Sequence, residues 1–130
     1  MIANFNSRII RRLVSAEGYM ELGMPVQAIQ ELESIEDAGV LEAPRQFLIG
    51  RALVAQGLYS DAVAPLEFAA RQMPSPVKKI AWRALSECYR ECGSDQLADV
   101  AEQIAGPPMV EQVSLQFPGL DMSVALDAVR

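Results

Sequence analysis

Apolar residues recur along most of this 130-residue chain at the three- and four-residue spacing of amphipathic helices. One run places Leu48, Ala52 and Leu53 on a shared face, and another does so with Ile29 and Leu32. Glycine and proline interrupt the runs at regular intervals. The pattern predicts an all-α fold with helices at about residues 5–22, 25–38, 44–56, 61–73, 76–91 and 95–105.

The glycines that end alternate runs are almost evenly spaced. Gly23 and Gly57 lie 34 residues apart, and Gly93 follows after another 36 residues. Each suits the left-handed residue that closes a helix, because a glycine inside a helix costs about 1 kcal/mol. A period of this length is typical of arrays that stack similar helix pairs.

Small residues recur where the two helices of each pair would touch. Close approach of two helices, to the short end of the usual range of about 8–10 Å, requires side chains of this size. The expected contacts are Ala16 with Ala28, Gly50 with Ala62, and Ser86 with Ala98. The three units therefore share both their turns and their expected packing positions.

The units resemble the tetratricopeptide repeat, a helix pair with the signature W-x2-L-G-x2-Y, then glycine at the turn and a small alanine. The third unit carries most of this signature, as Trp82, Leu85, Ser86, Tyr89, Gly93 and Ala98. The chain departs from it at Arg12, Ser15 and Gln46. The resemblance implies a right-handed superhelical array over residues 1–106, with repeats at about 9–42, 43–76 and 79–106.

In this family the first helix of each repeat lines the inner, concave wall. Carried over by position, the resemblance implies a partner-binding groove at Leu13, Glu17, Met20, Phe47, Arg51, Val54, Arg83, Glu87 and Arg90. Such a groove is apolar toward its N-terminal end and charged toward its C-terminal end, which suits a peptide or helix of a partner protein. The alternative is that Phe47 and Leu13 pack against the neighbouring repeat.

Charge and hydropathy exclude several other classes. The net charge is −6, and the chain lacks the dense basic surface that nucleic-acid binding requires. No apolar run approaches the roughly 20 residues of a membrane span. The N-terminus lacks the apolar core of a secretory signal, so we expect a cytoplasmic protein.

Catalytic and metal-binding side chains are scarce. The chain has no histidine, the commonest general base and zinc ligand. Cys88 and Cys92 lie one helical turn apart, without the further ligands that a zinc site needs. We interpret them as small buried or half-buried residues, with a redox pair as the alternative. The sequence predicts no enzyme activity, no metal and no cofactor.

Residues 107–130 belong to no repeat and form a tail rich in apolar residues, with a short helix predicted near its end. We expect the tail to cap the last helix pair; pairing with a second copy, which would give a homo-oligomer, is the alternative. The sequence thus predicts a protein-binding adaptor or dedicated chaperone. A self-assembling scaffold that uses its tail or end faces is the other possibility.

Overall fold

The computed structural model describes the backbone of residues 2–107 and the side chains of residues 7–107; residues 108–130 of the predicted tail lie outside them. Within this part of the chain the helices are α1 (Ile2–Glu21), α2 (Pro25–Glu33), α3 (Glu42–Ala55), α4 (Tyr59–Gln72), α5 (Val77–Glu91) and α6 (Asp95–Ala105). A 3-10 turn, η1 (Gly39–Leu41), precedes α3. The predicted all-α fold is confirmed for these residues.

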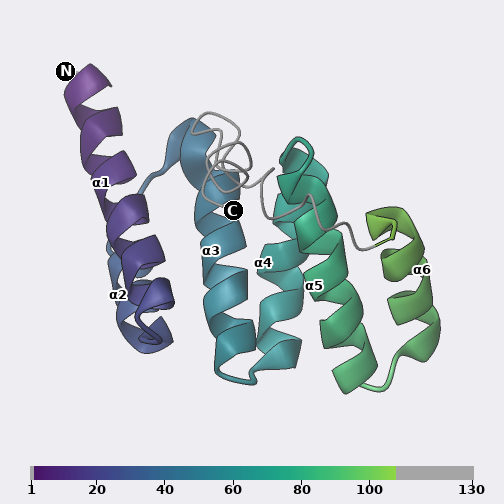
Figure 1. Ribbon diagram of the computed structural model, residues 1–130. Helices are drawn as coiled ribbons and strands as arrows, with labels where there is room; N and C mark the ends of the chain where they lie inside the picture. Colours follow the sequence, from purple (N-terminus) through teal and green to yellow (C-terminus); the bar gives the residue numbers. More distant parts are fainter. Residues whose placement is uncertain (1, 108–130) are drawn as a thin grey trace, which may run out of the picture.

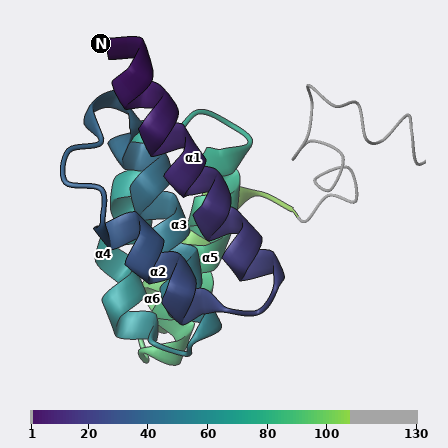
Figure 2. The ribbon, with the colours of Figure 1, turned by 90° about the vertical axis from the view of Figure 1, so that its left-hand side faces the viewer.

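The helices lie in a row in the order of the sequence, and neighbours run in opposite directions (Figure 1). Each helix packs against the next one along the chain, and contacts also join α1 to α3 and α3 to α5. Seen from the α1 end, α2 lies beside the lower part of α1, and the later helices lie behind this first pair (Figure 2). The two ends of the row are therefore α1 and α6, and each has a side that no described helix covers.

The same hydrogen-bonded turn closes α1, α3 and α5. In the first of these turns the Met24 N–H donates to the Tyr19 carbonyl at 2.8 Å, and the Gly23 N–H donates to the Met20 carbonyl at 3.0 Å. The turns at residues 57–58 and 93–94 repeat both bonds. This Schellman arrangement requires a positive φ at the glycine, and the three glycines have φ of 73°, 76° and 86°. The predicted turns are confirmed.

Small residues dominate the contact between the helices of each pair. All six that the sequence placed there are buried: Ala16, Ala28, Gly50, Ala62, Ser86 and Ala98. The space beside Gly50 is filled by Leu66, one turn further along α4 than the expected Ala62, because a Cβ on Gly50 would lie 2.6 Å from the Leu66 Cγ. Leu66 is fully buried in a cluster that includes Leu85 of α5, so consecutive pairs share one core.

The second helix is shorter than predicted. It ends at Glu33, whereas the apolar spacing predicted an end near residue 38. That prediction is wrong because Ile35 and Ala38 keep the helical spacing but lie in the linker, where they are nevertheless buried at 5% and 3% exposure. Asp37 accepts a hydrogen bond from the Gly39 N–H at 3.0 Å, and Gly39 has a φ of 58°. This local turn directs the chain into α3.

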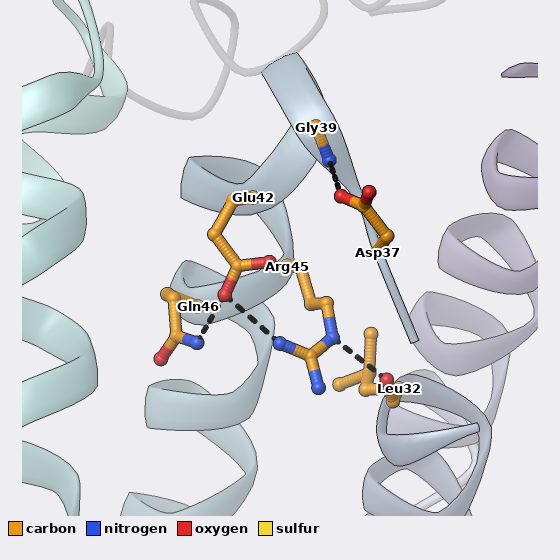
Figure 3. A network of polar contacts seen from close by, with 6 residues as sticks. All are labelled: Leu32, Asp37, Gly39, Glu42, Arg45 and Gln46. Carbon is orange, nitrogen blue, oxygen red and sulfur yellow. Dashed lines mark hydrogen bonds and ion pairs between the residues drawn. The ribbon is translucent and has the colours of Figure 1, made fainter. Parts of the chain in front are cut away.

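A side chain of α3 caps the C-terminal end of α2 and so connects the pair α3–α4 to the pair α1–α2 (Figure 3). The Arg45 Nε donates to the Leu32 carbonyl at 2.8 Å, and its Nη1 donates to the Glu42 carboxylate at 2.9 Å. Gln46 donates to the same carboxylate oxygen at 2.6 Å. The last carbonyls of a helix have no donor within the helix and favour a nearby cation. Arg45 therefore caps α2 and orients α3 against it.

Candidate functional site

The nine residues predicted to line the groove occupy three equivalent positions on α1, α3 and α5, and we call them the first-helix wall. By position they are Leu13, Phe47 and Arg83, then Glu17, Arg51 and Glu87, then Met20, Val54 and Arg90. The apolar members pack inward: Phe47 is 9% exposed within the core of α3 to α6, and the other three are half-buried against the core clusters. The burial of Phe47 favours the alternative that the sequence left open for it, packing against the neighbouring repeat.

The middle position of the first-helix wall is charged on all three helices. Glu17, Arg51 and Glu87 are exposed, so negative, positive and negative side chains follow one another from α1 to α5. The Arg51 guanidinium lies over the Phe47 ring, 5.6 Å from its centroid. A cation over an aromatic ring at an exposed site contributes about 0.5–1 kcal/mol, which orients this arginine along the wall.

A hollow of about 560 Å³ lies where α5 meets α6, and we call it the terminal hollow. Its lining residues are Arg83, Ser86, Glu87, Arg90, Glu91, Asp99 and Glu102. The structure thus brings three predicted wall residues together with two carboxylates of α6 that the sequence reasoning missed. The lining holds four carboxylates and two guanidinium groups, so its formal charge is −2.

The two arginines of the terminal hollow hold α6 against α5. The Arg90 Nη2 lies 2.9 Å from Glu102 Oε1 and 3.5 Å from Asp99 Oδ1. The Arg83 Nη2 donates to the Gly106 carbonyl at the end of α6 at 2.7 Å. The side chains of the Arg90 pairs are about half exposed, and exposed pairs of this kind contribute at most about 1 kcal/mol each. They position charge more than they stabilise the fold.

Two carboxylates of the terminal hollow remain available. Within residues 7–107, Glu87 and Glu91 form no ion pair. Burial raises the pKa of Tyr59 on α4, and the charges of Glu87 and Glu91 raise it further. This side of the hollow can therefore accept a positively charged group from a partner.

The cysteines differ in environment. Cys88 is fully buried, and its pKa is raised from the ordinary 9.0 to about 11, first by burial and then by Glu87 and Cys92. Its thiol stays protonated near neutral pH and is a poor nucleophile. Cys92 is exposed at the end of α5, so the prediction of burial or half-burial is correct for Cys88 alone. Among the described residues no group of three potential metal ligands occurs.

Comparison with protein-family models, with curated proteins and with solved structures found no match for this chain. None of the helices in the described range combines the length and hydrophobicity needed to cross a bilayer. The first-helix wall and the terminal hollow are therefore the features that indicate a function, through their geometry and charge.

Proposed function

We propose that this chain is a non-catalytic protein-binding module, built as a tetratricopeptide-like superhelical array, that serves as an adaptor or dedicated chaperone. It takes a helical or extended segment of a partner protein along the first-helix wall. The observation that carries the proposal is the terminal hollow, which collects an excess of carboxylates at one end of that wall. The repeated turns and the row of antiparallel helices support it.

Charge selects the kind of segment that binds. Glu87 and Glu91 face the hollow without ion pairs among the described residues, whereas Arg90 already contacts Asp99 and Glu102. A segment with lysine or arginine complements this surface, and complementary charge increases both association rate and selectivity. The volume of about 560 Å³ lies within the usual range for ligand pockets and admits long basic side chains.

Selection of peptides tests the proposal. The full chain is immobilised and used to select binders from a displayed library of random peptides. Enriched peptides should carry clustered lysine or arginine, and their affinity should fall with rising salt, because exposed charge pairs are screened. The double substitution Glu87→Lys and Glu91→Lys should weaken their binding at least tenfold.

The matched control is Glu33→Lys with Glu36→Lys, which changes the net charge equally at exposed positions at the end of α2 and in the linker. This variant should keep the affinity of the unchanged chain for the selected peptides. Selected peptides without basic residues, or peptides that lose affinity equally for both variants, would contradict the proposal.

A further inference from the structure

Consecutive helix pairs are joined by a recurring contact. At the junction of α2 and α3, the Arg45 Nε donates to the Leu32 carbonyl at 2.8 Å. At the junction of α4 and α5, the Lys78 Nζ donates to the Ala70 carbonyl. In both, a basic side chain near the start of a first helix meets a carbonyl in the last turn of the preceding second helix, where donors are lacking. The two residues stand three positions apart in the repeat, so a junction carries a basic residue at one of two positions, that of Arg45 or that of Lys78.

The uncovered side of α1 carries basic residues at both of these repeat positions. The repeat spacing of 34 and then 36 residues places Arg11 at the position of Arg45, and Arg8 at the position of Lys78. Both arginines are exposed, and neither forms an ion pair with any residue from 7 to 107. They help to line a hollow of about 370 Å³ on α1. Among the described residues, no helix pair lies against this side of α1.

Apolar residues on the same side of α1 support this interpretation. Val14 takes the position of Leu48, which is 8% exposed in the core shared by α1, α2 and α3. Val14 itself is 62% exposed, and Ile10 is 48% exposed. We call Arg8, Ile10, Arg11 and Val14 the α1 end surface. It has the composition of a helix-packing surface that is left open.

The far end of the row has the opposite charge. Asp99 and Glu102 of α6 take the positions of Val63 and Leu66 of α4, which pack in the core shared with α5. Their side chains are 67% and 57% exposed. Gly106 follows at the position of Ala70, whose carbonyl receives Lys78. We call Asp99, Glu102 and Gly106 the α6 end surface. Arg90 contacts Asp99 Oδ1 and Glu102 Oε1, and Arg83 donates to the Gly106 carbonyl. The second oxygen of each carboxylate and the second lone pair of the carbonyl are what this surface offers to a further first helix.

We propose that the α1 end surface of one copy docks on the α6 end surface of a second copy. Arg8 and Arg11 then lie against Asp99 and Glu102, with the carbonyl of Gly106 in the role of the Ala70 carbonyl. The proposal names the partner of the terminal hollow and rests on the proposed function of that hollow as a site for basic segments. Because the two surfaces differ, the contact is head to tail and gives rings or open chains of copies.

The charge of the tail makes it a poor occupant of the α6 end surface. Residues 108–130 contain three carboxylates, at Glu111, Asp121 and Asp127, and one arginine, at Arg130. Their side chains therefore sum to −2, the same sign as Asp99 and Glu102. A basic helix such as α1 complements this surface, and the tail does not.

Analytical ultracentrifugation of the full chain tests the proposal. The weight-average mass should exceed 14.2 kDa at high concentration and low salt, and should return to it in high salt. The α1 reversal, Arg8→Glu with Arg11→Glu, and the α6 reversal, Asp99→Lys with Glu102→Lys, should each lower the association constant at least tenfold. An equimolar mixture of the two should associate again, because each reversed surface meets one of opposite charge.

Arg71→Glu with Lys79→Glu is the control, because it makes the same charge change as the α1 reversal at exposed positions away from both end surfaces. It should associate like the unchanged chain. Melting curves establish that each variant is folded. A mass of 14.2 kDa at every concentration overturns the proposed contact between copies. The proposed function is tested independently by the peptide selection described above. Association that survives both reversals, or a mixture that fails to associate, places the contact elsewhere and also overturns it.

Discussion

Two glycines inside helices offer a matched test of how closely α3 and α4 pack. Gly50 lies in α3 and Gly18 in α1, and neither has a positive φ. A Cβ on Gly50 would lie 2.6 Å from both Cγ and Cδ2 of Leu66 and 3.4 Å from its backbone nitrogen. A Cβ on Gly18 would meet nothing within 4 Å. The same substitution to alanine therefore probes a filled and an empty space.

The magnitudes follow from two opposing effects. Alanine in place of glycine inside a helix stabilises by about 1 kcal/mol, at both positions. At Gly50 the added methyl also overlaps Leu66, which is fully buried, and overpacking costs about 1–3 kcal/mol. Gly18→Ala should therefore raise the free energy of unfolding by up to about 1 kcal/mol. Gly50→Ala should leave it unchanged or lower it by up to about 2 kcal/mol.

Urea unfolding followed by circular dichroism measures both variants, and the two should differ by about 1–3 kcal/mol. Leu66→Ala removes the overlapping atoms, so in that background Gly50→Ala should become neutral or stabilising, a coupling that a double-mutant cycle reports. If Gly50→Ala stabilises as much as Gly18→Ala, then α3 and α4 do not approach as closely as the structure describes.

Two further predictions concern the titration of a thiol and the covering of α6. Between pH 9 and 11 the free energy of unfolding should fall, because the Cys88 pKa is near 9.0 in the unfolded chain and about 11 in the folded one. Urea titrations should show a shallower fall in Cys88→Ala. The fall should change much less in Cys92→Ala, which removes only the smallest of the three causes that raise the Cys88 pKa. Leu97, Val100 and Ile104 form an exposed apolar stripe on α6, and their helical spacing puts this stripe on a different face from the α6 end surface. We expect the tail to cover the stripe, so the joint change of these residues to glutamine should lower the melting temperature of the full chain but not of a chain ending at Pro107.

The parts of the fold that the sequence predicted best depend on local geometry. Gly23, Gly57 and Gly93 each stand where a helix must close with a positive φ, and few other residues allow that conformation. The end of α2 was missed because the spacing of buried residues continues through Ile35 and Ala38 into a linker. Burial alone does not distinguish a helix from an irregular segment packed on the same core.

The site was less predictable because its character comes from contacts between helices. The position of Phe47 on the first-helix wall was foreseeable, but its burial depends on how deeply α3 lies between its neighbours. Asp99 and Glu102 enter the terminal hollow only because α6 folds back on α5. One signal was present in the sequence: these carboxylates stand in register with the apolar Val63 and Leu66 of the preceding unit.

Helix α6, which carries Asp99 and Glu102, has the smallest buried side chains of the described helices. Ala98, Ala101 and Ala105 are the buried residues of α6, whereas α4 also buries Leu66. Local opening of α6 should therefore cost less free energy than unfolding of the whole chain. A partner that binds only when α6 is in place has an apparent affinity scaled by the closed fraction. Substitutions that change the helix propensity of α6, at exposed Gln103 for example, would then tune binding through this fraction.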